Sequence, residues 1–90
     1  MDQETMLVAL KVDLGITTTA YDVRLSQYLT AAREAIRIEG INLTASISDC
    51  NLIVMYAAWL WKKRDTAEGM PRNLRWMMNN RLFSQKLSEE

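Results

Sequence analysis

The longest apolar run in the chain covers residues 52–61 and has the sequence LIVMYAAWLW. This run is about half as long as a membrane-spanning helix needs to be, so no membrane partner is expected. A central strand is one interpretation, but strands average about 5–6 residues, and the two alanines inside the run favour a helix. A helix that is apolar on every side lies at the centre of a bundle or is covered in part by another molecule. The run therefore predicts a buried central helix.

The segment around this run, residues 47–64, has helix signals at both ends. Ser46 and Asp49 have the spacing of a capping box, in which side chains accept hydrogen bonds from the free N–H groups of the first turn. The basic residues 62–64 follow the run and place positive charge at the negative end of the helix dipole. Both signals support a helix with these bounds.

A further helix is predicted downstream, over residues 71–86, because Pro71 suits the first position of a helix. Its apolar residues fall on two faces. One face contains Leu74, Met78 and Leu82. Nearly opposite lie Trp76, Phe83 and Leu87. One bundle core can bury only one of these faces, so we expect the first set to pack inward and the second set to form a subunit or partner interface.

Two helices are predicted upstream, over residues 2–14 and 20–39. Each is followed by a glycine and an isoleucine, Gly15-Ile16 and Gly40-Ile41. A glycine at this position supplies the left-handed backbone of a Schellman stop, and the apolar residue after it packs back on the helix. The same helix terminator is thus expected twice.

The start of the 20–39 helix is predicted from Thr19 and Asp22, which have the spacing of a capping box. Leu29 in this helix and Tyr56 in the 47–64 helix lie on faces assigned to the core. The fold class predicted from these segments is all-α, a small bundle of about four helices. We expect a single domain over residues 1–90.

The composition excludes several kinds of catalytic and metal site, since the 90 residues include no histidine and a single cysteine, Cys50. A His-based catalytic triad, an internal disulfide and a zinc cluster are therefore ruled out. We interpret Cys50 as part of the core rather than as a reactive thiol. Asp65 and Glu68 are interpreted as a solvated turn rather than as a metal or acid–base pair. No enzymatic activity, cofactor or metal is expected.

Eleven basic and eleven acidic residues cancel overall, but they are unevenly distributed. Residues 1–61 contain four basic and seven acidic residues, whereas residues 62–86 contain seven basic and two acidic ones. Six of the basic residues in the second group define a candidate basic strip: Lys62, Lys63, Arg64, Arg72, Arg75 and Lys86. With the interleaved aromatic residues, this strip supports one alternative function, a small helical DNA-binding regulator. Solvated helix faces and compensation of the helix dipole explain most of the same charges.

Several stretches of the sequence resemble small bacteriophage head–tail connector proteins, which are also described as phage DNA-packaging proteins. The first stretch is LGIT at residues 14–17, followed by a helix with the pattern Asp22, Leu25, Leu29, Ala32, Ala35 and Ile36. Later stretches are similar to prophage members of that group: YAAWLW at 56–61, MPRNLRW at 70–76 and NNRLF at 79–83. The resemblance spans most of the chain, and its motifs are structural patterns that are moderately specific together.

The resemblance implies an all-α protein that assembles as a homo-oligomeric ring beneath the portal of a filled capsid. Such a ring extends the DNA channel, contacts packaged DNA without sequence specificity and offers a surface to the tail-completion protein. The family has no catalytic residues to carry over. The implied location is the head–tail junction of the virion, after synthesis and assembly in the cytoplasm of the bacterial host. Asp2 and Glu4 agree with this, because a secretory signal begins with positive charge.

Overall fold

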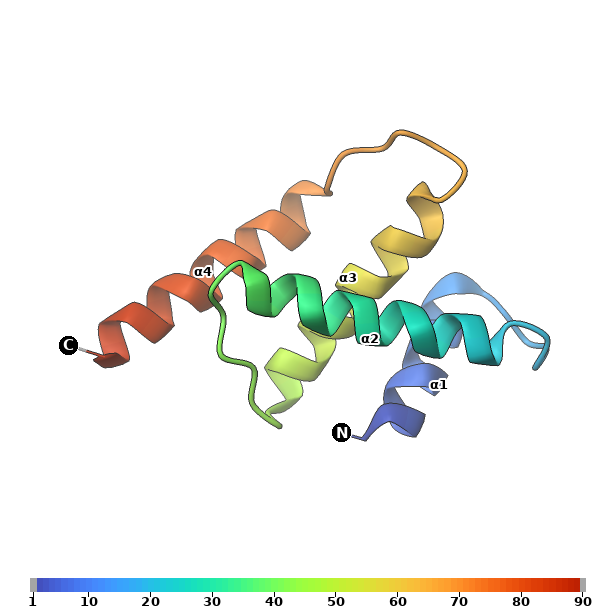
Figure 1. The fold of residues 1–90 in the computed structure, drawn as a ribbon, viewed down its shortest axis with the longest axis horizontal. Coiled ribbons are helices and arrows are strands. Elements are labelled where there is room, and N and C mark those ends of the chain that lie inside the picture. The colour runs from blue at the N-terminus through green and yellow to red at the C-terminus, as the bar shows by residue number, and fades with distance from the viewer. Residues whose placement is uncertain (1, 90) are drawn as a thin grey trace.

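The computed structural model describes residues 2–89, which form four helices and no strand (Figure 1). The helices are α1 (Gln3–Leu14), α2 (Asp22–Ile38), α3 (Ile47–Lys63) and α4 (Arg72–Glu89). The predicted all-α class is therefore confirmed. The largest differences in bounds are the later start of α2, at Asp22, and the longer α4, which continues to Glu89.

The central helix is α3, which packs against each of the other three helices. α1 and α2 also pack on each other, whereas α4 packs on no helix other than α3. Figure 1 shows α2 crossing in front of α3, with α1 and α4 on opposite sides of that pair. The strand interpretation of residues 52–61 is therefore wrong, and the prediction of a buried central helix is confirmed.

All four helices contribute side chains to one core. α3 supplies more of them than any other helix, including Leu52, Ile53, Val54, Tyr56 and Ala57. α2 adds a row of fully buried residues at the spacing of one helix face: Leu25, Leu29, Ala32 and Ile36. Burial of a leucine side chain contributes roughly 1.5–3 kcal/mol, so this row is a main source of stability. The core positions predicted for Leu29 and Tyr56 are confirmed.

Both glycines end their helices with left-handed backbone, and the full Schellman pair of bonds forms at Gly15. Gly15 has a φ of 70°, and its N–H donates to Val12 O at 3.2 Å while the N–H of Ile16 donates to Lys11 O at 2.9 Å. This is the pair of bonds that defines a Schellman motif. Gly40 has a φ of 102°, and its N–H donates to Arg37 O at 2.9 Å. A residue with a Cβ would be strained at either glycine, because both adopt left-handed backbone.

One of the two predicted caps is confirmed. The Ser46 hydroxyl oxygen accepts a hydrogen bond from the Asp49 N–H at 3.1 Å and caps α3. The Thr19 cap is wrong, because α2 begins at Asp22 with Tyr21 at its N-cap and no side-chain cap bond. The Asp22 carboxylate instead forms an ion pair with Lys11 of α1 at 2.8 Å. The Asp22 side chain therefore contacts another helix instead of taking part in a capping box at the start of its own helix.

The core assignment of α2 predicts a large loss of stability for Leu29→Ala. Leu29 is fully buried, so removing its side-chain atoms loses their burial and leaves a cavity that costs about 2–5 kcal/mol of unfolding free energy. The matched control is Val23→Ala on the exposed side of the same helix, which should change stability by less than about 0.5 kcal/mol. Urea unfolding followed by circular dichroism measures both. Equal stability of the two variants would show that the register of α2 is wrong.

Candidate functional site

The position of α4 depends first on an apolar contact with α3. Leu74 and Met78 are buried, and Leu82 is partly buried against the same core. These are the three residues that the sequence predicted to face inward. Because α4 packs on only one other helix, this contact leaves most of its circumference uncovered.

A polar cluster fixes the rotation of α4 about this contact. The Arg81 Nε donates to Asp49 Oδ1 at 2.7 Å, and its Nη2 donates to Asp49 Oδ2 at 3.1 Å. Such a two-pronged geometry is stronger and more directional than a single bond. Thr44 adds two donors to Asp49 Oδ2, its N–H at 2.8 Å and its hydroxyl at 2.9 Å. We call the Asp49 and Arg81 pair the α3–α4 clamp.

Gln85, one turn after Arg81, extends the clamp to the connection between α2 and α3. Its Nε2 donates to Gly40 O at 2.8 Å, and its Oε1 accepts from the Asn42 N–H at 2.7 Å. Arg81 Nη2 also donates to Asn42 O at 2.8 Å. The backbone of residues 40–44 is thereby tied to the same edge of α4, and the helix cannot roll without breaking these bonds.

The clamp is sheltered from water at its acidic end. Asp49 is 2% exposed. Burial alone raises the pKa of its carboxyl, but hydrogen bonds from Arg81 and Thr44 outweigh that effect and hold the pKa below its usual 3.8. The same bond to Asp49 raises the pKa of the Arg81 guanidinium. Both groups are therefore charged at neutral pH and hold each other in place.

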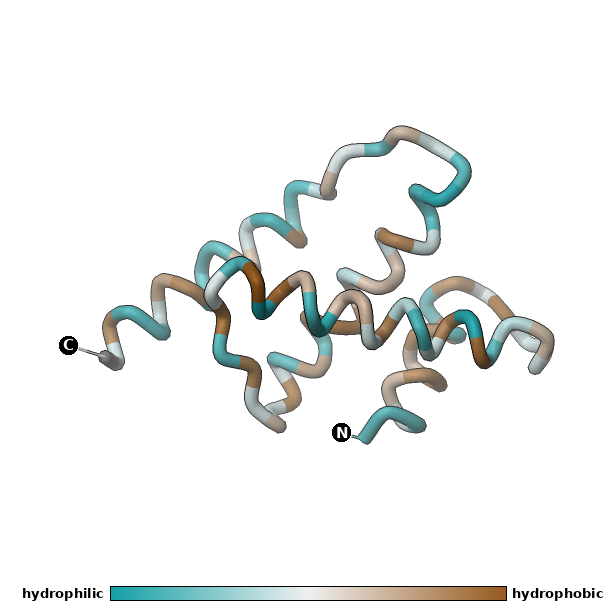
Figure 2. The backbone as a smooth tube through the Cα atoms, in the orientation of Figure 1, coloured by the Kyte–Doolittle hydropathy of each residue, from teal (hydrophilic) through white to brown (hydrophobic). Residues whose placement is uncertain are grey.

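The face of α4 opposite the clamp carries large apolar side chains that no other part of the described chain covers. Trp76, Phe83 and Leu87 are 65%, 63% and 55% exposed. Their spacings of seven and four residues place them within about 40° on the helix and over about 16 Å of its length. Figure 2 shows hydrophobic positions recurring along α4 out to its C-terminal turns. We call these three residues the outer α4 stripe.

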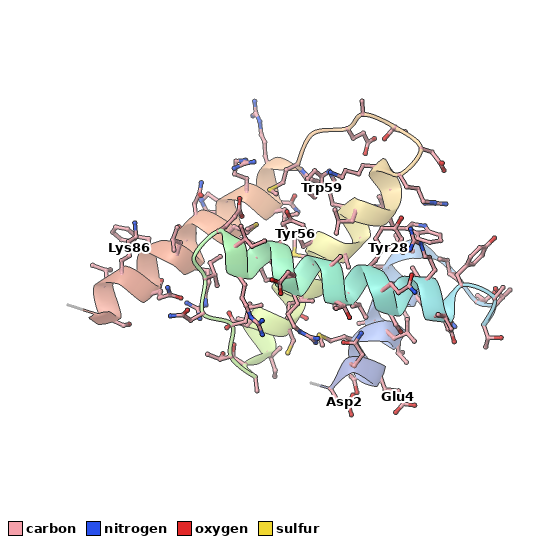
Figure 3. The ribbon with its side chains drawn as sticks, viewed as in Figure 1. Asp2, Glu4, Tyr28, Tyr56, Trp59 and Lys86 are labelled. Carbon is pink, nitrogen blue, oxygen red and sulfur yellow. The ribbon has the colours of Figure 1, made fainter. Side chains whose placement is uncertain are left out.

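The residues of the candidate basic strip come from two helices. Arg72, Arg75 and Lys86 are exposed along α4, beside the outer α4 stripe. Lys86 lies near the C-terminal end of α4, about 21 Å along the helix axis from Arg72 (Figure 3). Residues 62–64 lie at the C-terminal end of α3. Lys62 lines the same pocket as Pro71 and Asn73, so the end of α3 lies beside the start of α4.

Two of the three tryptophans and two of the basic residues are engaged with each other. Lys63 Nζ lies 4.3 Å from the centre of the Trp59 ring, and the Arg64 guanidinium lies 3.7 Å from that of Trp61. The Trp59 ring also makes an edge contact with Tyr56 at 5.3 Å (Figure 3). In these cation–π contacts the positive charges of Lys63 and Arg64 interact with aromatic rings of the same chain. Trp76 differs from both, since it lies on the outside of α4.

The remaining candidate groups lie in different parts of the described chain. Cys50 is buried in α3, while Asp65 and Glu68 are exposed in the connection to α4. Among residues 2–89, no three Asp, Glu, Cys or His side chains are placed to hold a metal ion. A pocket of about 290 Å³ lies beside Trp59 and Leu74, and its charged lining residues Asp13, Lys62 and Glu68 come from three different segments. Within the same range, no helix is both long and apolar enough to span a membrane.

Sequence reasoning missed the α3–α4 clamp. One signal was present, because Arg81 falls on the same side of its helix as Leu74 and Leu82, where a charged residue needs a buried partner. Asp49 was assigned only to the start of α3, and its partner lies 32 residues later.

The chain was compared with protein families, curated proteins and solved structures. No protein-family model matches the sequence, and no curated protein or solved structure is significantly similar to it.

Removal of Arg81 tests whether the clamp holds α4. Arg81→Met leaves the Asp49 carboxylate buried without its partner, which typically costs about 3–5 kcal/mol of unfolding free energy. The matched control is Arg75→Met on the same helix, where the side chain is exposed and the cost should be below about 0.5 kcal/mol. Thermal and urea unfolding measure both. A loss below 1 kcal/mol for Arg81→Met would mean that the apolar contact alone positions α4.

The pH dependence of stability should reflect the Asp49 carboxylate. Its folded-state pKa is lowered from 3.8, so its stabilising contribution is complete above that pH and is lost as the pH falls through the folded-state value. The Asp49→Asn variant has no carboxylate to protonate. The difference in Tm between wild type and Asp49→Asn should therefore narrow from about pH 5 to pH 2. A difference that stays constant over this interval would contradict the lowered pKa.

Proposed function

We propose that this protein is a non-enzymatic structural protein of a tailed phage or prophage, which assembles as a ring at the portal and joins head to tail at the end of DNA packaging. The observation that carries the proposal is the outer α4 stripe. Two aromatic side chains and a leucine remain exposed in one line on a helix whose orientation is fixed.

Exposed apolar residues gathered in one place are typical of protein–protein interfaces, and tryptophan and phenylalanine are enriched there. Fully buried aromatic residues of 150–250 Å² each dominate interface energetics. The α3–α4 clamp holds the stripe in position before any partner arrives, which lowers the entropy lost on binding. These properties support a role in assembly rather than in catalysis.

The resemblance to head–tail connectors supplies the identity of the partners in this proposal. They are further copies of the chain, the portal protein and the tail-completion protein, and the place of action is the head–tail junction of the virion. Ring closure requires a contact between two different surfaces of the same chain. The packaged DNA would pass through the ring and touch it without sequence recognition.

The proposal predicts a selective loss of association for the double variant Trp76→Ala/Phe83→Ala. Truncation of an interface tryptophan commonly costs about 2 kcal/mol or more, so self-association and co-sedimentation with portal rings should weaken at least about 30-fold. Folding should be retained, because both residues are exposed in the single chain. The matched control is Val23→Ala/Ile38→Ala, which removes exposed apolar groups from α2.

Two results would contradict the proposal. Unfolding of the Trp76→Ala/Phe83→Ala variant without selective loss of association would show that this face serves the core. Tight binding of short duplex DNA that weakens steeply with salt, together with no self-association and no portal binding, would favour the DNA-binding regulator instead.

A further inference from the structure

We infer that the outer α4 stripe of one copy packs on the exposed face of α1 of the next copy, head to tail. This inference rests on the proposed function and specifies the surface that receives the stripe. The receiving surface consists of Glu4, Val8 and Val12, and we call it the outer α1 face.

The outer α1 face is apolar along its length and acidic at its N-terminal end. Val8 and Val12 lie one turn apart and are 58% and 73% exposed. Glu4 continues the same row toward the N-terminus. The buried residues Met6 and Leu10 lie on the other side of the helix, so the exposed valines are not part of the core. α1 thus leaves apolar side chains in water as α4 does.

The charges of the two surfaces are complementary once internal pairs are removed. Lys11 is the one basic residue of α1, and it is already paired with Asp22 at 2.8 Å. Glu4, with the N-cap Asp2, therefore leaves the start of α1 acidic.

On α4 the corresponding internal pair is Arg81 with Asp49. The exposed basic residues Arg72, Arg75 and Lys86 lie along one side of the outer α4 stripe and form no ion pair with the side chains of residues 2–88. A basic border on one surface thus meets an acidic border on the other, which favours correct encounter and register.

The two surfaces also match in length. The stripe extends over about 16 Å of α4, and the twelve residues of α1 span about 18 Å. Two helices of this length can pack side by side along most of the stripe, with the apolar residues of each in the contact.

The positions of α1 and α4 require the contact to form between copies. Within one chain the two helices both pack on α3 and do not pack on each other. Figure 3 shows Asp2 and Glu4 at the lower side of the molecule, at the start of α1, and Lys86 near the left-hand end, on α4. After each head-to-tail contact, the growing assembly still has one free stripe at one end and one free α1 face at the other. Further subunits can therefore add until the two ends meet and close a ring.

A symmetric contact between two outer α4 stripes is the competing arrangement. It would bring the exposed Arg72, Arg75 and Lys86 of both copies close together with no acidic residue from α1 between them. Like charges placed together at an interface are unfavourable. The charge distribution therefore favours α1 as the receiving surface.

A mixing experiment with two neutral double variants tests the inference. The stripe variant is Trp76→Gln/Phe83→Gln, which keeps a normal outer α1 face. The face variant is Val8→Gln/Val12→Gln, which keeps a normal stripe. All four positions are exposed and glutamine is a good helix former, so circular dichroism should show folded protein in both cases.

Sedimentation at concentrations where wild type associates gives the readout. Each variant alone should remain at the monomer mass of 10.4 kDa, because it lacks one of the two surfaces. An equimolar mixture should form a 1:1 pair that grows no further, since only one productive contact is possible. The pair should weaken as sodium chloride is added, because the charged borders are screened.

Two outcomes would overturn the inference. If the face variant alone associates as well as wild type, the stripe does not use α1, although the protein still assembles and the proposed function stands. An equimolar mixture of the two variants that stays monomeric would likewise show that the stripe does not pack on α1. If wild type neither self-associates up to millimolar concentration nor sediments with portal rings, the proposed function itself is wrong.

Discussion

The charged contact between Asp49 and Arg81 determines the rotation of α4 about its own axis, and so which side of α4 faces the solvent. A carboxylate that is 2% exposed cannot remain charged without partners, and its partners here are Arg81 and Thr44. Because Arg81 sits on one edge of α4, meeting this requirement sets the rotation of the whole helix. The outer α4 stripe then has to face away from the bundle.

The rest of the architecture follows from the uniform apolar character of α3. α1 and α2 cover α3 together, and α4 covers what they leave with Leu74, Met78 and the partly buried Leu82. A helix with two apolar faces cannot bury both against a single neighbour. The chain therefore retains exposed aromatic side chains on α4 and exposed valines on α1, and both become buried if copies pack head to tail.

Local patterns in the sequence were sufficient to predict the helices, the glycine stops at Gly15 and Gly40 and the Ser46 cap. Contacts between distant residues were not predictable in the same way. The Thr19 cap failed because Asp22 pairs with Lys11 of another helix, and spacing along one helix gives no sign of such a partner.

Sedimentation of the wild-type chain over a wide range of concentration, at low and at high salt, tests the central claim of assembly through exposed apolar surfaces most directly. The account predicts a mass that rises above 10.4 kDa with concentration and does so more readily at low salt, because apolar contact and charge complementarity act together. A mass that stays at 10.4 kDa at every concentration and both salt levels would contradict it.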